Sequence, residues 1–174
     1  GPAIAERQID EGNTAIELRH VAAAYIIYHL LEQMLGQGVF PTARQHGTSM
    51  LVRVPHASGL LDGTVTETTV FTEDDHRYHR VSTDEKKQQW QMDGLKKVKQ
   101  LAFLTDGTGR TLGQAALKFI LAEPSVAAVF PNIYNDALLS EFAAASDALD
   151  LSGTDLSRIS RLYADAFGLE LVEP

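Results

Sequence analysis

The chain has 174 residues, a net charge of −8 and a pI near 5.1, and it contains no cysteine. Disulfides, thiolate catalysis and cysteine-bound zinc are therefore excluded, and the acidic balance argues against nucleic acid, because phosphate binding requires a basic face. The apolar runs are shorter than the roughly 20 residues of a membrane-spanning helix. We expect one cytoplasmic domain over residues 1–174 with no membrane partner, and we interpret Gly1-Pro2 as a tag remnant.

The first third of the chain contains two apolar runs that are typical of buried strands. Residues 3–19 show helical spacing of apolar side chains, with an interruption expected near Gly12 and Asn13. The runs over residues 21–31 and 49–54 suit strands covered on both faces, as in a parallel sheet. Gly36 and Gly38 indicate a turn, which is followed by a short helix over residues 39–46.

The middle of the chain, over residues 62–90, is a long polar segment that is typical of a loop. Long loops in compact domains are usually functional or mobile. Within it, Asp75-His76-x-x-His79 spaces two histidines as on one helix face, a pattern that can hold a metal. The arginines beside them repel a cation, so we assign no metal site. A helix is expected from about Gln89 to Leu104.

The last third contains well-marked helix starts. Thr111 and Gln114 form a capping box for a helix that ends at Pro124. A third strand over residues 126–130 precedes a helix capped by Asn135 and Asp136. A final capped helix follows over residues 152–167, beginning with Ser152 and Asp155.

This alternation of helices and strands predicts an α/β fold with a parallel sheet. A closed barrel of this type needs eight strands and roughly 250 residues. Because only three strands are recognisable, the predicted fold is a partial, half TIM-barrel-like sheet flanked by helices.

Polar side chains follow the predicted strands. Parallel strands bring their carboxyl ends to one mouth, which is where barrel ligands bind. Histidines there could move a proton, and Arg53 could hold a carboxylate or an enolate. Each also has a structural interpretation, as a satisfied core histidine or as one half of an ion pair. The polar set at the mouth comprises Tyr28, His29, Glu32, Arg53, His56, Asn132 and Tyr134.

Several segments resemble the aldo-keto reductase family, in the family's order. Residues 51–61 (LVRVPHASGLL) are similar to its Ser-Pro-Leu-Ala-x-Gly-Leu-Leu segment, which ends the seventh strand and wraps the nicotinamide cofactor. Residues 28–31 resemble the Tyr-Asn-Leu-Leu that ends its sixth strand. Residues 111–123 and 129–134 resemble the last barrel helix, the eighth strand and its phosphate-binding loop. The resemblance implies a truncated or divergent member, corresponding to the C-terminal half only.

The resemblance also implies what is missing. The family's catalytic Asp, Tyr, Lys and His lie near strands two to four, and nothing in this sequence corresponds to them. Tyr25 stands where a Gln normally contacts the nicotinamide, and Arg53 where an aromatic ring stacks on it. Leu138 and Phe142 replace the adenine-side Gln and Asn. No cofactor is therefore expected, with NADP(H) kept as an alternative. It would lie at Ser58, Gly59, Leu60 and Asn135.

The leading hypothesis is a small-molecule enzyme that catalyses a non-redox step, such as cyclisation, dehydration or isomerisation. Its catalytic candidates are Tyr25, His29 and His56, and its substrate-binding candidates are Tyr28, Glu32, Arg53, Asn132 and Tyr134. The alternatives are an NADP(H)-dependent oxidoreductase fragment or subunit, and a non-catalytic partner protein. The open edges of a three-strand sheet predict a homodimer.

Overall fold

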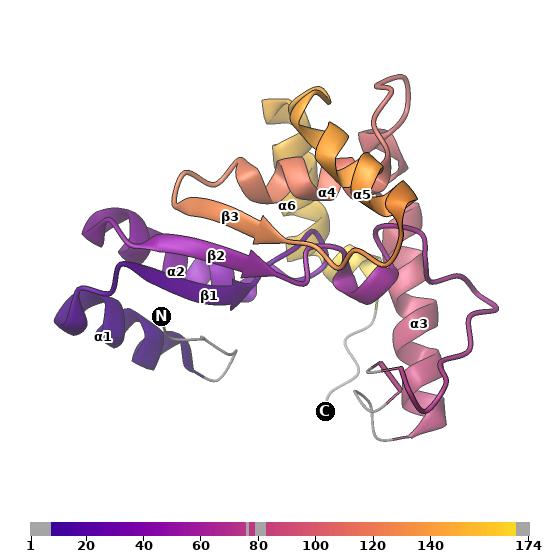
Figure 1. The fold of residues 1–174 in the computed structure, drawn as a ribbon, viewed down its shortest axis with the longest axis horizontal. Coiled ribbons are helices and arrows are strands. Elements are labelled where there is room, and N and C mark those ends of the chain that lie inside the picture. The colour runs from indigo at the N-terminus through magenta and orange to yellow at the C-terminus, as the bar shows by residue number, and fades with distance from the viewer. Residues whose placement is uncertain (1–7, 76, 79–82, 170–174) are drawn as a thin grey trace.

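A parallel sheet of three strands forms the centre of the molecule (Figure 1). The computed structural model describes residues 8–75, 77, 78 and 83–169. The strands pair in chain order, and their carboxyl ends all point toward α3 in Figure 1. The predicted partial barrel is confirmed. The strands are β1 (Ala23–Ile27), β2 (Ser49–Arg53) and β3 (Val126–Phe130).

Six α-helices accompany the sheet in the described part of the chain, in the alternating order that the sequence predicts. In Figure 1, α4 and α5 lie on the side of β3, whereas α1 packs against α2 on the side of β1. The helices are α1 (Ile9–Arg19), α2 (Met34–His46), α3 (Asp84–Lys99), α4 (Leu112–Leu121), α5 (Asp136–Ala143) and α6 (Gly153–Ala164). Within the described residues, no helix is both long and apolar enough to cross a bilayer.

The two faces of the sheet differ sharply in burial. Alternate residues of β1 and β2, such as Ile26 and Val52, are fully buried in the main core. The residues between them point to the opposite face, where Tyr25 is half-buried and Arg53 is exposed. Phe130 pairs with Arg53 in the register and keeps 46% of its surface exposed. The sheet therefore has one covered face and one open face.

The expected turn at Gly36 and Gly38 is wrong, because both glycines lie inside α2. A Cβ on Gly36 would lie 2.5 Å from the rings of Tyr28 and Phe40, and one on Gly38 would lie 2.8 Å from Ile9. The glycines thus let the Tyr28 ring and α1 approach the helix closely. Close packing, rather than a chain reversal, requires them here.

Three other boundaries differ from expectation. α1 continues through Gly12, which is buried, and β1 stops at Ile27 rather than at residue 31. After β1 the chain reverses in a tight turn, in which the backbones of His29 and Glu32 exchange two hydrogen bonds of 3.0 Å. α3 begins at Asp84, well before Gln89, because the Thr83 side chain accepts a hydrogen bond from the Lys86 backbone N–H.

The predicted helix caps are confirmed. Thr111 and Gln114 form a reciprocal capping box on α4, and Ser152 and Asp155 form another on α6. Asn135 caps α5 by accepting a hydrogen bond from the Leu138 backbone N–H at 2.9 Å. Short polar signals therefore fix where these helices begin.

The homodimer stays a prediction. The outer edges of β1 and β3 have no strand partner in the described part of the chain, and unpaired edges favour association. Light scattering at high micromolar concentration should give a mass of twice 19.0 kDa. A mass of 19.0 kDa under those conditions would contradict it.

Candidate functional site

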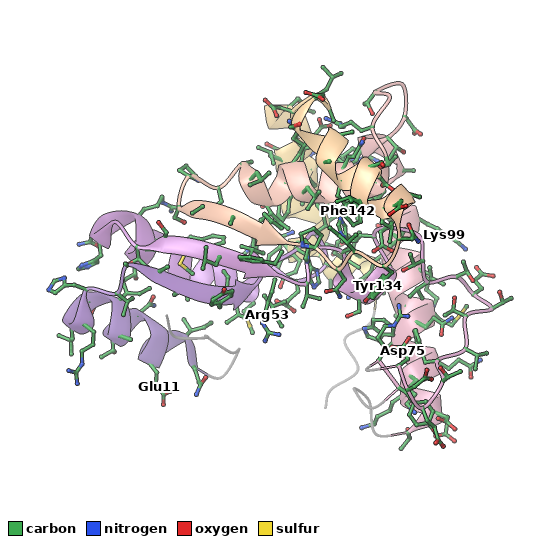
Figure 2. The ribbon with its side chains drawn as sticks, in the orientation of Figure 1. Glu11, Arg53, Asp75, Lys99, Tyr134 and Phe142 are labelled. Carbon is green, nitrogen blue, oxygen red and sulfur yellow. The ribbon has the colours of Figure 1, made fainter. Side chains whose placement is uncertain are left out.

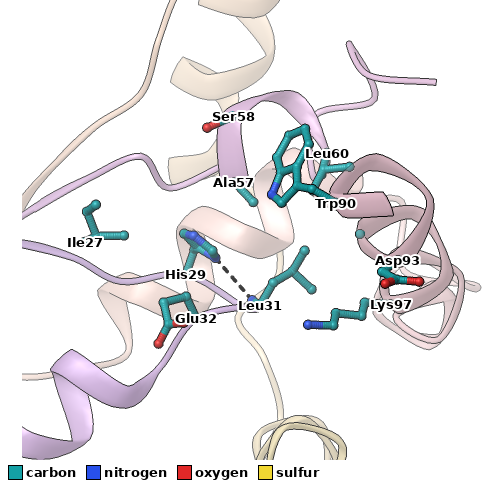
Figure 3. Close-up of a pocket in the computed structure, with 11 residues that line it drawn as sticks. Ile27, His29, Leu31, Glu32, Ala57, Ser58, Leu60, Trp90, Asp93 and Lys97 are labelled. Carbon is teal, nitrogen blue, oxygen red and sulfur yellow. Dashed lines mark hydrogen bonds between the residues drawn. The ribbon is translucent and has the colours of Figure 1, made fainter. Parts of the chain in front are cut away.

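A pocket of about 380 Å³ lies beyond the carboxyl end of β1, between the chain that follows β1, the loop after β2 and one side of α3 (Figure 3). This volume is at the lower end of the range for small-molecule sites, roughly 300–1,000 Å³. The pocket is where barrel folds place their ligands. Its lining residues are Ile27, His29, Leu31, Glu32, Ala57, Ser58, Leu60, Trp90, Asp93, Gly94 and Lys97.

The walls of the pocket follow from local backbone geometry. After β2 the chain folds back sharply through a short 3-10 helix at 57–59, with Val54, Ala57 and Ser58 at positive φ. This places Ala57 and Leu60 opposite α3. Gly94 lets the helix come close, since a Cβ there would lie 2.5 Å from Leu60. The tight turn after β1 supplies the facing wall.

The ring of His29 is held in one orientation. Its Nδ1 accepts a hydrogen bond from the Leu31 backbone N–H at 3.3 Å, so the neutral ring carries its proton on Nε2. His29 is 7% exposed and contributes to the pocket wall, as Figure 3 shows. In this tautomer the ring is a hydrogen-bond donor at Nε2, which suits the polarisation of a carbonyl oxygen better than proton abstraction.

The two carboxylates of the pocket are held differently. Asp93 accepts hydrogen bonds from Gln89 and from Lys96, which lower the pKa of its carboxyl group. Glu32 uses one oxygen, Oε1, to accept from the Met34 backbone N–H and from the Tyr163 hydroxyl, both at 3.0 Å. Burial raises the pKa of Tyr163, which keeps this hydroxyl protonated and donating. Oε2 of Glu32 is the carboxylate oxygen that these contacts leave for a ligand.

Lys97 supplies the positive charge of the pocket. In Figure 3 its side chain extends from α3 toward Leu31 and Glu32. Within the described residues it makes no ion pair; its ammonium lies 5.8 Å from the ring centroid of Phe167. Trp90, two turns earlier on the same side of α3, forms an aromatic wall.

His56 does not reach this pocket, contrary to its expected place at the mouth. Its Nε2 hydrogen-bonds the Gly113 carbonyl at 3.1 Å, and its ring stacks on Phe142 with centroids 4.2 Å apart. The side chain is 4% exposed, and Nδ1 lies 3.9 Å from the Asp62 carboxylate. Burial lowers the pKa of His56, against the opposing effects of the Gly113 carbonyl and of Asp62 and Glu141. Its surroundings are those of a packed core residue.

The structure also separates the other candidate residues. Tyr28 lies in the core, stacked on Phe119 at 5.1 Å between centroids, and burial raises its pKa far above the usual range. Tyr25 and Arg53 lie on the open face of the sheet, outside the pocket, with Tyr25 5.7 Å from Phe130. Figure 2 shows Arg53 near the carboxyl end of the sheet and Tyr134 on the loop after β3.

Asn132 and Tyr134 are exposed and lie away from the pocket walls. Of the residues predicted at the mouth, the structure therefore brings together only His29 and Glu32.

Of the residues considered for a metal, His76 and His79 lie outside the described residues. In the described part of the chain no group of three metal-ligating side chains is present.

Three residues on α3 complete the pocket and were not predicted from the sequence. Trp90, Asp93 and Lys97 are spaced at three and four residues, so they share one helix face. The only signal available was this spacing together with the chain's single tryptophan. The pocket side of α3 could be recognised only once the loop after β2 was placed against it.

Comparison with known proteins agrees with this partial barrel. The sequence model of the aldo/keto reductase family matches residues 7–164, and the chain belongs to that family. The fold is similar to the glycerol dehydrogenase AKR11B4 from Gluconobacter oxydans (TM-score 0.75, 19% identity), covering 99% of this chain and 50% of that one. It is also similar to the holo form of aldo-keto reductase AKR11C1 from Bacillus halodurans (TM-score 0.61, 23% identity), covering 92% and 48%.

The chain thus spans about half the length of these solved structures. Among proteins with curated functions, none shows significant sequence similarity to it. The similarity to the solved structures establishes the fold, and the chemistry has to be argued from the residues of the site itself.

The residues at the expected cofactor positions do not fit the NADP(H) that this family uses. Leu138 and Phe142 are apolar and buried, and the Asn135 side chain is occupied in capping α5. The carbonyl of Ser58 accepts from Arg77, while a Cβ on Gly59 would meet Thr64, Val65 and Arg77.

The backbone N–H groups of the same loop are also occupied. Those of Ala57, Gly59, Leu60 and Leu61 bond to carbonyls within the loop, so these donors do not face a pyrophosphate. We therefore derive no chemical step through a nicotinamide.

Proposed function

We propose that the protein binds a small carbonyl compound in the pocket beside α3 and removes a proton from the carbon next to the carbonyl. Cyclisation, dehydration and isomerisation of carbonyl compounds can all begin with this enolisation, which needs no redox cofactor. The observation that supports the proposal most directly is the fixed tautomer of His29 in the pocket wall.

His29 and Glu32 take complementary parts in this step. The Nε2–H of His29 donates a hydrogen bond to the carbonyl oxygen and stabilises the negative charge that develops there. Oε2 of Glu32 takes the proton, while Oε1 stays bound to Met34 and Tyr163. The C–H electron pair becomes the C=C bond of the enol, and the carbonyl oxygen receives a proton from His29 or from water.

Proton exchange tests this proposal without knowledge of the natural substrate. In D₂O, the protein should speed the loss of the methylene ¹H NMR signal of phenylacetone. His29→Asn keeps an acceptor for Leu31 but removes the Nε2 donor. It should slow the protein-dependent rate about a hundredfold, the lower end of typical acid–base contributions.

The control is His46→Asn, which changes an exposed histidine at the end of α2 and should leave the rate unchanged. Equal rates for wild type and His29→Asn would contradict the assigned role of His29. A rate no faster than that of buffer alone would contradict the enolisation itself.

An NADP(H)-dependent oxidoreductase, completed by the other half of a barrel, is the second candidate. The family match over residues 7–164 favours it, and the poor fit at the cofactor positions argues against it. A titration that follows the fluorescence of NADPH separates the two. Binding at low micromolar concentration would favour the oxidoreductase.

A further inference from the structure

The charges in the pocket are unequally compensated. Asp93 is neutralised by Lys96 at 2.9 Å and accepts a further hydrogen bond from Gln89. Glu32 lies at the N-terminus of α2, where it receives the Met34 N–H and where the helix dipole favours a negative charge. Lys97 forms no ion pair with a carboxylate among the described residues, although its charge contributes to the lowered pKa of Asp93, one turn earlier on α3.

His29 is a further polar group of the wall. Its Nδ1 accepts a hydrogen bond from the Leu31 backbone N–H, so the proton of the neutral ring is on Nε2. Apart from Ser58, the rest of the lining is aromatic or aliphatic, with Trp90, Leu31 and Leu60 forming the larger surfaces. A ring or chain of carbon atoms fits those surfaces, and a negatively charged group fits the ammonium of Lys97.

We infer that the ligand of this pocket is a small carboxylate with an apolar or aromatic body, whose carboxylate binds Lys97 and whose body packs on Trp90. This rests on the proposed function only in using the same pocket, and it narrows the substrate to a carbonyl compound that also bears a carboxylate. Lys97 then anchors the carboxylate, and the length of the substrate between its carboxylate and its carbonyl carbon sets how far from Lys97 the reaction takes place.

The single tryptophan reports binding directly, because Trp90 lines the pocket. Its fluorescence is titrated with three probes of one shape and different charge: phenylacetate, phenylacetamide and phenethylamine. Phenylacetate should bind at least about tenfold more tightly than the neutral amide, a preference that one charge-assisted contact can provide. Phenethylamine should bind most weakly.

The Lys97→Met variant tests the charge of Lys97 separately from its apolar stem. It keeps the length and apolar stem of the side chain, and it should reduce the preference for phenylacetate over phenylacetamide to less than about twofold. Lys99→Met is the matched control, since Lys99 is 72% exposed and pairs with Glu67 outside the pocket. Both variants should retain the wild-type circular dichroism spectrum.

Each outcome bears on a different claim. Equal or tighter binding of phenylacetamide or phenethylamine by the wild type would overturn the carboxylate inference and leave the enolisation proposal standing. A phenylacetate preference that survives in Lys97→Met would overturn the role of Lys97. No response of Trp90 to any probe would overturn the inference and the use of this pocket together. Phenylacetate binding without exchange of the methylene protons of phenylpyruvate, which bears both the carbonyl and the carboxylate, would leave the inference and remove only the proposed reaction.

Discussion

Replacing Arg110 with methionine should lower the free energy of unfolding by about 1.5–3 kcal/mol, the range expected when hydrogen bonds made by a charged group are lost. Arg110 is 6% exposed, and its guanidinium donates to the carbonyls of Leu104, Leu149 and Asp150 at 2.8–3.2 Å. Methionine fills much of the volume but leaves the buried carbonyl of Leu104 without its donor, which costs about 1–3 kcal/mol. Leu149 and Asp150 are exposed residues, so water can replace the guanidinium at their carbonyls.

Urea unfolding measured by circular dichroism checks this value. Arg161→Met is the control, because Arg161 is exposed on α6 and should change stability by less than about 0.5 kcal/mol. Arg110→Lys should recover little, since an ammonium cannot reach carbonyls on separate segments as a guanidinium does. A loss below about 1 kcal/mol for Arg110→Met would show that water replaces the lost donors.

The second large effect is expected at His56, as a loss of stability in acid. Its pKa in the folded chain lies below the usual value for histidine, about 6.5, because burial against Phe142 and Gly113 disfavours the charged ring. The unfolded chain therefore takes up the proton first as the pH falls. The contribution of His56 to the free energy of unfolding is complete above about pH 6.5. It is lost as the pH falls through the lower folded pKa, by up to about 1.4 kcal/mol per pH unit.

Stability against urea, measured between about pH 8 and pH 5, tests this assignment. His56→Gln cannot be protonated, so the stability difference between wild type and variant should shrink as the pH falls. At the upper pH the variant should be about 2 kcal/mol less stable, because the ring stacking is lost and the Gly113 bond is remade imperfectly. For His46→Gln, a change at an exposed site, the free energy of unfolding should vary with pH as it does in wild type. A constant offset between wild type and His56→Gln would contradict the assignment, because it would show that His56 has the same pKa in the folded and unfolded chain.

The sequence predicts much of the fold because its signals are local. The centres of all three strands and the caps at Thr111, Asn135 and Ser152 depend on nearest neighbours along the chain. Gly36 and Gly38 show the opposite case, because what requires glycine there is not local. They make room for Tyr28 and Ile9, which tertiary packing brings close to α2. Because turns and close contacts both favour glycine, the sequence alone cannot tell one from the other.

The site was less predictable than the fold. Tyr28 and His29 are adjacent, yet one ring packs on Phe119 and the other faces the pocket, because β1 ends at Ile27 and a tight turn begins. A sequence that suggests a longer strand therefore places Tyr28 wrongly at the mouth, whereas His29 does reach the pocket. His56 follows a strand end, as ligand-binding residues do, but the left-handed residues of its loop turn it into the core.

The end of the chain holds both walls of the pocket. Tyr163 of α6 bonds Glu32 on one wall, while the carbonyl of Phe167 accepts from Gln100, just past α3, at 2.6 Å. Both contacts thus come from α6 and the 3-10 turn that follows it, neither of which lines the cavity. Mutations confined to the lining residues would leave these two hydrogen bonds untested. Removing them should widen the cavity for every ligand.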